Sequence, residues 1–408
     1  MLWVNVVEPF WNSKNRLKGV MKMKVLHVLS SDDKYGSAQC FIELLKQELD
    51  DGKVEPVVIT PKANDINTIC NELGVTNYCI EYNQFQIPKH DIWPVFILKY
   101  VYHFLCYYLH NFMAEKKVIS LVEKHNIDVI HTNSCVVDLG STVARKTGRI
   151  NIWHLREFGR EDFCFYSIKR SYINKMNEQQ NIFIAISSAV RKTWTEKGID
   201  SQRTYMLYDG VDRTRFNGEC VPKMGTKKIK FVMCGSFCEA KNQRLLVEAL
   251  HQLPNEIIST IQVDFYGKKE GAYFEEISKL VKEYHLDEIV RFMGFANNIP
   301  LVLKKYDVGV MCSRAEAFGR VTVEYMFAGL CPLVPETGAN YEIIVENQCG
   351  LTYEESNAVA LCEAIKRICQ GDIDLTHYAR KANKVALEKY DINKNAKSII
   401  RLFKDFAK

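Results

Sequence analysis

The residues best suited to chemistry lie in one stretch of the chain, CSRAEAFGRVTVEYMFAG at residues 312–329. A buried-strand pattern is followed there by a loop of small residues and by a helical pattern that begins near residue 318. Backbone N–H groups at a helix N-terminus favour a bound phosphate, and here they would belong to Phe318, Gly319 and Arg320. Glu316 in the loop and Glu324 on the helix, with seven residues between them, could accept hydrogen bonds from hydroxyl groups of a sugar and a ribose.

The two glutamates alone are also consistent with a solvated loop residue and a helix-face residue, so neighbouring motifs must decide. The sequence contains no convincing metal-binding motif. Asp372-Ile373-Asp374 resembles a D-x-D motif, but it follows Gly371 near a helix start, where aspartate is a common N-cap. No other cluster of His, Asp and Glu has credible ligand spacing. We therefore expect neither a metal nor a cofactor.

The elements that must position these residues alternate between short apolar runs and helical patterns. In the first half, strands are predicted at Lys24–Ser30, Val57–Thr60, Asp128–His131, Asn151–His154, Ile182–Ile186 and Thr204–Leu207. A second series follows at Lys230–Cys234, Gln262–Tyr266, Val290–Met293, Val308–Met311 and Cys331–Val334. This alternation predicts parallel strands with right-handed crossovers. The fold class is therefore α/β, with two doubly wound domains in tandem, each of which would bind ligands at the carboxyl ends of its strands.

The length of 408 residues, 47% of them hydrophobic and 25% charged, suits two globular domains. Residues 1–22 read as a leader or extension, because Glu8 interrupts an otherwise apolar start and makes it a poor secretory signal. The predicted divisions are a first domain at 23–207, a linker at 208–228, a second domain at 229–390 and a lone amphipathic helix at 391–408.

The composition excludes several classes of function. A net charge of +5 is too mild for a dedicated nucleic-acid binder. The 14 cysteines form no regular framework, which favours reduced thiols in a cytosol. The absence of a G-x-G-x-x-G motif after the first strand argues against a dehydrogenase.

One internal stretch, Ile92–Leu109, reads IWPVFILKYVYHFLCYYL. It is long enough to approach a bilayer span, but Pro94, Lys99 and His103 interrupt it. Its aromatic residues and the following Lys116-Lys117 pair suit a helix that lies in the lipid headgroup zone. A helix hairpin in the protein core is the alternative, and the sequence does not choose between the two.

Glu316 and Glu324, with Phe318-Gly319 between them, resemble the E-x7-E signature of family-4 glycosyltransferases. Further segments agree in order and spacing: Gly235-Ser236-Phe237 to Lys241-Asn242, Phe265-Tyr266-Gly267, Val290–Phe295, Tyr306-Asp307-Val308, and Pro335–Glu342 with Asn347–Leu351. The resemblance covers almost the whole chain, from about residue 24 to residue 406. It implies a GT-B fold, in which two domains face a cleft and a C-terminal helix crosses back to the first domain.

The resemblance also implies roles for individual residues. Lys241 would contact the diphosphate of a nucleotide-sugar, Glu324 the ribose, and Glu316 hydroxyl groups of the transferred sugar. Glu316, Lys241 and His154 would form the catalytic set. The donor site would include Gly36, Gly235, Ser236, Lys241, Phe318, Gly319, Arg320 and Glu324, and further site candidates are His131, Arg156 and Arg314.

Ser236 is a departure from the family pattern, which usually has an arginine at this position. A serine hydroxyl cannot supply a second positive charge to the diphosphate. Three consequences are open: Arg320 or Arg314 takes over, donor affinity falls, or catalysis is lost.

The function implied is a retaining glycosyltransferase of polysaccharide or glycoconjugate biosynthesis. The first candidate for the donor is a UDP-sugar, and the second candidate is a GDP-sugar. The acceptor would be a saccharide or a polyprenyl-linked saccharide. We expect a cytoplasmic protein, with contact to the inner face of the cell membrane through residues 92–109 as a further hypothesis. The alternatives are a GT-B sugar-nucleotide epimerase and a binding or assembly protein that has lost activity at Ser236.

Overall fold

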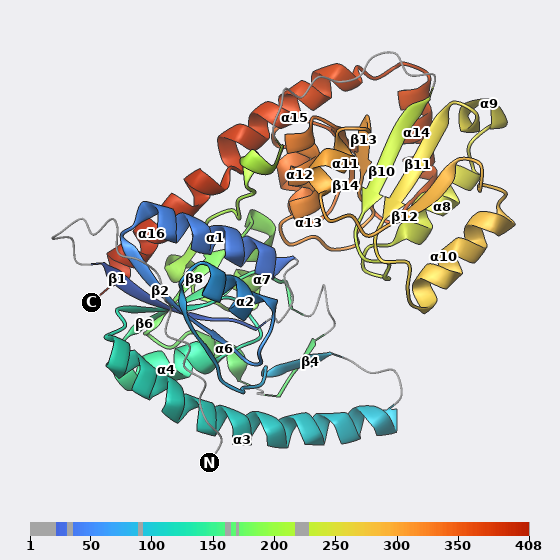
Figure 1. The fold of residues 1–408 in the computed structure, drawn as a ribbon. Helices are drawn as coiled ribbons and strands as arrows, with labels where there is room; N and C mark the ends of the chain where they lie inside the picture. Colours follow the sequence, from blue (N-terminus) through green and yellow to red (C-terminus); the bar gives the residue numbers. More distant parts are fainter. Residues whose placement is uncertain are drawn as a thin grey trace. The chain divides into compact units, whose positions relative to one another are not determined.

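The computed structural model describes residues 22–30, 36–88, 93–159, 165–168, 171–216 and 228–407. The chain divides into two compact units (Figure 1): unit 1 runs to Gly210 and resumes at Ile392, and unit 2 is Val211–Asp391. The predicted leader lies outside the described residues except for Lys22, and so do residues 217–227 of the predicted linker.

Unit 1 is built on a seven-stranded parallel sheet with the order β3-β2-β1-β5-β6-β8-β9. The strands are β1 (Met23–Val28), β2 (Val54–Thr60), β3 (Thr76–Cys79), β5 (Val129–Thr132), β6 (Ile150–Leu155), β8 (Asn181–Ala185) and β9 (Thr204–Met206). Strands β1, β2, β5, β6 and β8 are largely buried and mostly apolar, as expected for a parallel sheet covered on both faces. The chain adds strands outward from β1 to β3 and then returns to the other side of β1, so the order reverses between β1 and β5.

The helices of unit 1 are α1 (Ser37–Asp51), α2 (Asp65–Glu72), α3 (Trp93–His125), α4 (Leu139–Thr147), α6 (Tyr172–Met176), α7 (Ser188–Glu196) and α16 (Ile392–Phe406). A two-stranded antiparallel ribbon pairs β4 (Gln86–Pro88) with β7 (Phe165–Ser167). The one-turn 3-10 helix η1 (Ser201–Arg203) leads into β9. The C-terminal helix α16 packs into the same core as Val25 of β1 and Ile152 of β6, which confirms that the chain returns to its first domain.

Unit 2 has a six-stranded parallel sheet with the order β12-β11-β10-β13-β14-β15. The strands are β10 (Ile229–Cys234), β11 (Ile261–Tyr266), β12 (Val290–Gly294), β13 (Val308–Val310), β14 (Cys331–Pro335) and β15 (Leu351–Tyr353). The helices are η2 (Arg213–Phe216), α8 (Gln243–His251), α9 (Asn255–Ile258), α10 (Ala272–Glu283), α11 (Ile299–Leu303), α12 (Arg320–Ala328), α13 (Gly338–Ile344), α14 (Ala358–Cys369) and α15 (Leu375–Lys389). The order reverses between β10 and β13, so both units have the doubly wound topology predicted from the sequence.

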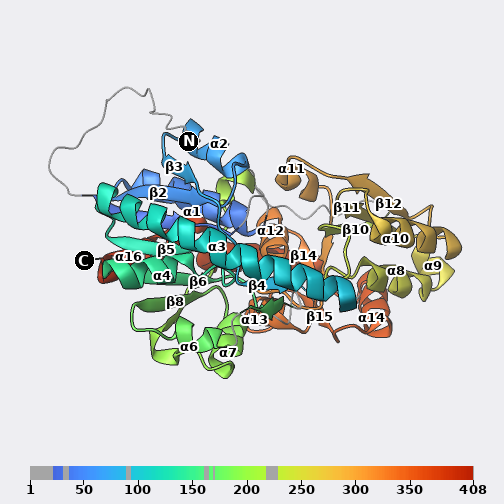
Figure 2. The same ribbon diagram turned by 90° about the horizontal axis from the view of Figure 1, so that it is seen from below.

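The structure excludes one of the two interpretations of residues 92–109, which were a helix in the lipid headgroup zone and a helix hairpin in the protein core. A core helix hairpin is wrong, because the stretch belongs to α3, a single unbroken helix of 33 residues (Figure 2). Many of its large apolar side chains are exposed rather than buried in a core. Among the described residues, no helix has the length and apolar character needed to cross a bilayer.

Candidate active site

Lys241 and Glu316 meet at the carboxyl ends of two neighbouring strands of unit 2. Lys241 lies in the turn after β10 and Glu316 in the loop after β13, and these strands pair where the strand order reverses. The Lys241 Nζ atom is 2.8 Å from the Glu316 Oε2 atom. Burial alone would lower the pKa of Lys241, but the charge and hydrogen bond of Glu316 outweigh burial and raise it. Lys241 therefore keeps its positive charge at the edge of the sheet where doubly wound proteins bind ligands.

The N-terminus of α12 lies beside this pair, because Glu316 belongs to the loop that leads into the helix. Gly319 is the N-cap in the left-handed conformation, with φ 77°, and a Cβ atom there would lie 2.8 Å from the Asn340 Oδ1 atom. The helix begins at Arg320, so the predicted start near Phe318 is too early. Phe318 instead packs its ring edge-on against Tyr390, with centroids 6.1 Å apart. The helical N–H groups that could face an anion therefore start at Arg320.

The loop that carries Glu316 is held by the next helix of unit 2. The Ala339 N–H donates to the Glu316 carbonyl at 2.8 Å. A Cβ atom on Gly338 would lie 2.6 Å from that same carbonyl oxygen, and Gly338 has φ 55°. The first turn of α13 therefore packs directly on the backbone of Glu316 and fixes its position.

Glu324 is held by two arginines inside unit 2. Its Oε1 atom is 3.2 Å from Arg320 Nε, one turn earlier on α12, and 3.4 Å from Arg215 Nη1 on η2. The ring of Phe216 stacks on Phe327 of α12 with centroids 5.6 Å apart, which anchors η2 to the helix. Arg215 was not among the predicted site residues, because it falls within the predicted linker.

The loop at Ser236 has a tight backbone. Gly235 has φ 152°. A Cβ atom on Gly267 would lie 2.2 Å from the Gly235 carbonyl oxygen, so the two backbones are in close contact. The Ser236 carbonyl accepts a hydrogen bond from the Gln243 side chain at 2.9 Å. Arg314, considered as a substitute for the missing arginine, has its guanidinium 3.9 Å from the exposed Glu239 carboxylate. Arg314 thus has an acidic neighbour of its own, as Arg320 does.

In unit 1, the predicted histidines are part of a buried chain at the reversal of strand order. The ring nitrogens of His27 on β1 and His131 on β5 are 2.9 Å apart, and those of His131 and His154 on β6 are 3.1 Å apart. The other end of the chain is Glu48 of α1, 3.0 Å from His27 Nε2. All four residues are fully buried. His27 and Glu48 were not among the predicted site residues, although a histidine inside the apolar run KVLHVLS is a signal that could have identified His27.

Arg156 sets the proton position on His154. The guanidinium forms an ion pair with Asp209, donates to Asn133 Oδ1 at 2.7 Å and lies 3.4 Å from His154 Nδ1. Burial first, and then the charge of Arg156, lowers the pKa of His154 well below its ordinary value. Because a guanidinium can only donate, His154 Nδ1 accepts and the proton lies on Nε2.

The Nε2 atom of His154 is buried and has no hydrogen-bond partner among the described residues; the Asp209 carboxylate is 3.8 Å away. The Nε2–H group is therefore a buried donor without an acceptor in the described part of the chain. His131 is satisfied on both ring nitrogens within the chain of histidines, so it supports His154 rather than offering a second donor.

The remaining predictions can be placed as well. Gly36 is the N-cap of α1, with φ 57°. Asp374 caps α15 by accepting from the His377 N–H at 3.0 Å, which confirms the N-cap interpretation of the D-x-D sequence. In the described part of the chain, no group of three or more His, Cys, Asp or Glu side chains is arranged to hold a metal.

A sequence model of the family "Glycosyl transferases group 1" matches residues 221–385, which lie in unit 2. A Campylobacter jejuni protein named N-acetylgalactosamine-N,N'-diacetylbacillosaminyl-diphospho-undecaprenol 4-alpha-N-acetylgalactosaminyltransferase is 25% identical over 206 residues. That alignment covers 50% of this chain and 54% of the relative, so it spans about half of each. The Escherichia coli UDP-Gal:alpha-D-GlcNAc-diphosphoundecaprenol alpha-1,3-galactosyltransferase is 24% identical over 329 residues, which cover 74% of this chain and 80% of the relative.

Solved structures share the fold over nearly the full length. The Anabaena HepE protein in complex with UDP has a TM-score of 0.76 at 19% identity, covering 94% of this chain and 100% of HepE. A glycosyltransferase from Rickettsia africae has a TM-score of 0.75 at 18% identity, covering 94% of this chain and 98% of that protein. The chain therefore has the GT-B fold, and residues 221–385 are similar to the glycosyl transferases group 1 family.

Proposed function

We propose that the protein is a retaining glycosyltransferase that moves a sugar from a nucleotide-diphospho-sugar to a lipid-linked saccharide. The observation that carries the proposal is the ion pair between Lys241 and Glu316, 2.8 Å long, beside the N-terminus of α12. A cation and a helix N-terminus suit a diphosphate, and a carboxylate beside them suits sugar hydroxyl groups. Glu324, in the middle of α12, would accept a hydrogen bond from the ribose.

The reaction breaks the bond between the anomeric carbon and the diphosphate oxygen. A new bond forms from that carbon to the acceptor oxygen, whose proton passes to the departing diphosphate. Negative charge grows on the leaving group, and Lys241 with the N–H groups of α12 would stabilise it. Attack from the face that the diphosphate leaves would retain the anomeric configuration. The Nε2–H of His154, without a partner among the described residues, would hold a hydroxyl group of the sugar.

UDP is the proposed nucleotide, with GDP second. The similar HepE structure contains UDP, and the Escherichia coli relative is named for a UDP-Gal donor. No metal is part of the proposal, because Lys241 and the helix N-terminus supply the positive potential at the diphosphate. Relatives named as transferases favour this reading over an epimerase or a binding protein.

The acceptor side of the proposal concerns the outer face of α3, which we define as Leu98, Val101, Tyr102, Leu105, Tyr108, Leu109, Phe112 and Met113. Leu98 is 72% exposed, Leu105 62% and Leu109 59%. These positions recur at helical spacing, so they form one apolar stripe more continuous than soluble proteins usually expose. Aromatic and leucine side chains of this kind insert into the headgroup zone of a bilayer. Two relatives are named for diphospho-undecaprenol substrates, and we infer that this protein likewise works at the inner face of the cell membrane.

Titration of UDP and of a panel of UDP- and GDP-sugars into purified variants tests the donor site. Lys241→Ala should weaken binding of both UDP and the nucleotide-sugar by about tenfold or more, because a charge-assisted contact to the diphosphate is lost. Glu316→Ala should weaken the nucleotide-sugar but leave UDP bound, because its proposed contact is to the sugar. Both variants should lose sugar transfer.

Lys282→Ala, an exposed lysine on α10, is the matched control for Lys241→Ala. Undiminished binding and transfer in both site variants would contradict the assignment. Donor isomerisation without an acceptor would instead identify an epimerase, and tight donor binding without turnover a binding protein.

A further inference from the structure

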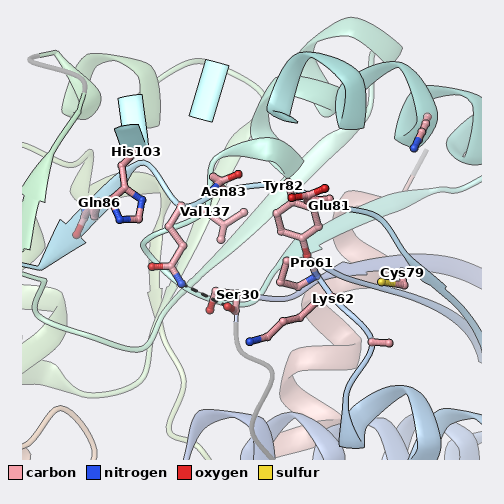
Figure 3. A pocket seen from close by; sticks show the side chains of 13 residues that line it. Ser30, Pro61, Lys62, Cys79, Glu81, Tyr82, Asn83, Gln86, His103 and Val137 are labelled. Atoms are coloured by element: carbon pink, nitrogen blue, oxygen red, sulfur yellow. Dashed lines mark hydrogen bonds between the residues drawn. The ribbon is translucent and has the colours of Figure 1, made fainter. Parts of the chain in front are cut away.

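A histidine and an aspartate face each other at the carboxyl edge of the sheet of unit 1. The Nε2 atom of His154 is 3.8 Å from the Oδ1 atom of Asp209 and has no hydrogen-bond partner among the described residues. The pair is separate from the open groove of about 720 Å³ between α3 and the loops after β1, β2 and β3, because neither residue lines that groove (Figure 3). At 3.8 Å the donor and the acceptor do not satisfy each other.

Asp209 is brought to His154 by the segment that follows β9. The side-chain amide of Asn395 on α16 donates to the Asp209 carbonyl oxygen at 3.0 Å. A Cβ atom on Gly210 would lie 2.3 Å from the Ile392 Cα atom, so the same segment packs tightly against the start of α16. The C-terminal helix therefore fixes the backbone from which the Asp209 carboxylate reaches the end of β6.

The Arg156 guanidinium orients that carboxylate. Its Nη1 atom pairs with Asp209 Oδ2, and its Nε atom donates to Asn133 Oδ1 at 2.7 Å. Because the guanidinium holds Oδ2, the other oxygen, Oδ1, faces His154. Burial and then the charge of Arg156 lower the pKa of His154, so the ring is neutral with its proton on Nε2. The site thus combines one N–H donor with one oxygen that can only accept.

One hydroxyl group matches this combination. A hydroxyl oxygen accepts from an N–H group at about 2.9 Å and donates to a carboxylate at about 2.7 Å. Since these two distances together exceed 3.8 Å, the oxygen can lie beside the line between Nε2 and Oδ1 and reach both atoms. Fluorine or a carbonyl oxygen would meet the carboxylate without a proton, and an ammonium group would meet the N–H group without a lone pair.

We propose that Asp209 is a sugar-binding residue that, together with His154, holds one hydroxyl group of the donor sugar. The inference rests on the proposed function, in which His154 donates to such a group, and it adds the acceptor. The His154 side chain is fully buried and that of Asp209 is 6% exposed, so the hydroxyl group approaches from the side of Asp209. A sugar without this hydroxyl group leaves a buried donor and a carboxylate oxygen unpaired, which makes the pair a determinant of sugar specificity.

Sugar analogues test the inference in the wild type. The probes are UDP-galactose, UDP-glucose and analogues of both in which one hydroxyl group is replaced by hydrogen or by fluorine. At one position of the sugar, hydrogen should weaken binding by about tenfold or more, because both hydrogen bonds are lost. Fluorine at that position should bind no more tightly than hydrogen, because it cannot donate to Asp209. The inference is overturned if no position has this effect, or if fluorine restores binding wherever hydrogen weakens it.

Asp209→Asn turns the acceptor into a donor. Arg156 can only donate, so it will face the amide oxygen and leave the amide NH₂ group toward His154. Two donors suit a fluorine atom better than a hydroxyl group. The variant should bind the parent sugar about tenfold more weakly and the fluorine analogue no more weakly, so that the discrimination falls by about tenfold. Asp138→Asn, which breaks another buried ion pair of unit 1, 2.8 Å from Lys175, should keep the discrimination of the wild type.

Equal losses of affinity for the parent sugar and the fluorine analogue in Asp209→Asn would show that Asp209 only supports Arg156, and would overturn the inference. If this variant does not fold, the comparison of hydrogen with fluorine in the wild type decides. Failure of the proposed function looks different, because the wild type would then bind neither UDP nor any nucleotide-sugar.

Discussion

Glu324 contacts two arginines, and this pairing affects which arginine could supply positive charge near Ser236. Arg320 and Arg215 lie on the same carboxylate oxygen, at 3.2 and 3.4 Å. If Arg320 moved to supply the charge that Ser236 lacks, Glu324 would keep Arg215 as its partner. Arg314, whose exposed neighbour Glu239 is 3.9 Å away, is the other arginine that could supply this charge. No motif in the sequence identifies Arg215.

The buried histidine chain has a fixed direction. Because His154 Nδ1 accepts, His131 Nε2 donates to it and His131 Nδ1 must accept from His27. His27 Nε2 then faces the Glu48 carboxyl group at 3.0 Å.

Stability at acid pH should depend on this chain. Burial, followed by the charges of His27 and Arg156, lowers the pKa of His131 well below its usual 6.5, and His154 is lowered in the same direction. In the unfolded chain both histidines bind protons below about pH 6.5. The unfolded state therefore takes up protons that the folded state does not, and stability falls as pH falls.

Each histidine should reduce the free energy of unfolding by up to about 1.4 kcal/mol per pH unit in that range. Denaturant unfolding of the wild type and of His154→Asn, between about pH 7.5 and about pH 5, measures the slope. The variant should be less stable but have a shallower slope, whereas His377→Asn, at an exposed position, should leave the slope unchanged. An identical slope in the wild type and His154→Asn would contradict the neutral, buried histidine.

At the scale of single residues, a sequence motif identifies the residues that belong to it. It does not identify residues that only the fold brings close to the candidate site. Lys241, Glu316 and Glu324 carry the family resemblance and do lie in neighbouring loops and on α12. His27 and Arg215 come from an apolar strand and from the predicted linker. Their importance depends on the pairing of β1 with β5 and on the packing of η2 on α12, which no local pattern encodes.

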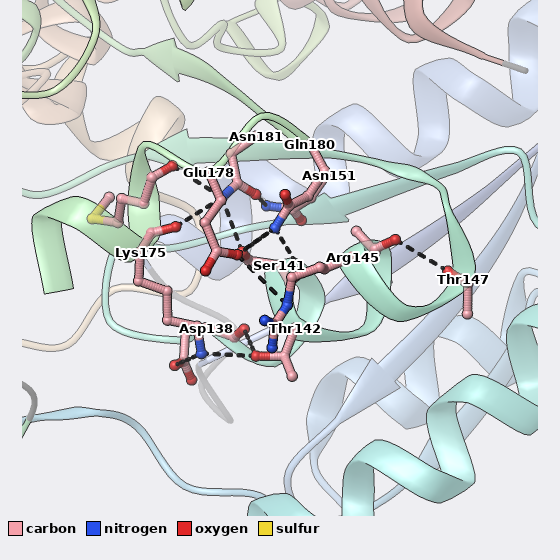
Figure 4. Close-up of polar contacts among 12 residues, drawn as sticks. Asp138, Ser141, Thr142, Arg145, Thr147, Asn151, Lys175, Glu178, Gln180 and Asn181 are labelled. Atoms are coloured by element: carbon pink, nitrogen blue, oxygen red, sulfur yellow. Dashed lines mark hydrogen bonds and ion pairs between the residues drawn. The ribbon is translucent and has the colours of Figure 1, made fainter.

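At the scale of elements, α3 is attached to unit 1 along one narrow side. The Tyr107 hydroxyl contacts both carboxylate oxygens of Asp138, at 2.9 and 2.7 Å. Asp138 is also held by Lys175 at 2.8 Å, within the polar network of Figure 4 that links α4 and α6. A helix with one buried side and a long apolar outer side needs a second apolar environment. The one-sided anchoring of α3 is therefore consistent with the contact that we propose between its outer face and a membrane.

Charge on the outer face of α3 should abolish membrane binding. Leu98→Glu/Leu105→Glu places two carboxylates in the stripe, where insertion would require them to leave water. Sedimentation with phosphatidylcholine vesicles should show a loss of about tenfold or more, because the transfer of two leucine side chains is lost. The fold and UDP binding should be preserved, since both positions are exposed. Val359→Glu, at a 66% exposed position on α14, is the control.

Unchanged vesicle binding in the leucine variant would show that the stripe serves another purpose. The sequence could raise this question but not answer it. Aromatic density at 92–109 indicated either an interfacial helix or a core hairpin, and only the continuous course of α3 excluded the hairpin. Most strands were easier to predict than this helix, because β1, β2 and β10 are runs of β-branched and apolar residues. The exceptions are β3 (TNYC) and β15 (LTY), which are too short and polar to be recognised.

For the molecule as a whole, the two units repeat one topology. Each starts at a central strand, adds two strands outward and then returns to the other side, at β1 and at β10. Both reversals carry the polar site residues of their unit: the histidines of β1, β5 and β6, and the Lys241–Glu316 pair after β10 and β13. The alternating pattern in the sequence predicted this topology because parallel strands require crossover helices.

The chain leaves unit 2 at Asp391, and its last helix completes the core of unit 1. Phe403 of α16 is fully buried, and its ring centroid is 5.2 Å from that of His131. Phe403→Ala should therefore destabilise unit 1 by about 3–5 kcal/mol, through lost transfer energy and a cavity beneath the histidine chain. Scanning calorimetry should show the transition of unit 1 at a lower temperature. The transition of unit 2, identified as the one that UDP raises, should not move. Lys397→Ala, on the exposed side of α16, should leave both transitions in place. If Phe403→Ala lowered the two transitions together, the units would unfold as one cooperative body, and α16 would act as a link between them rather than as a part of unit 1.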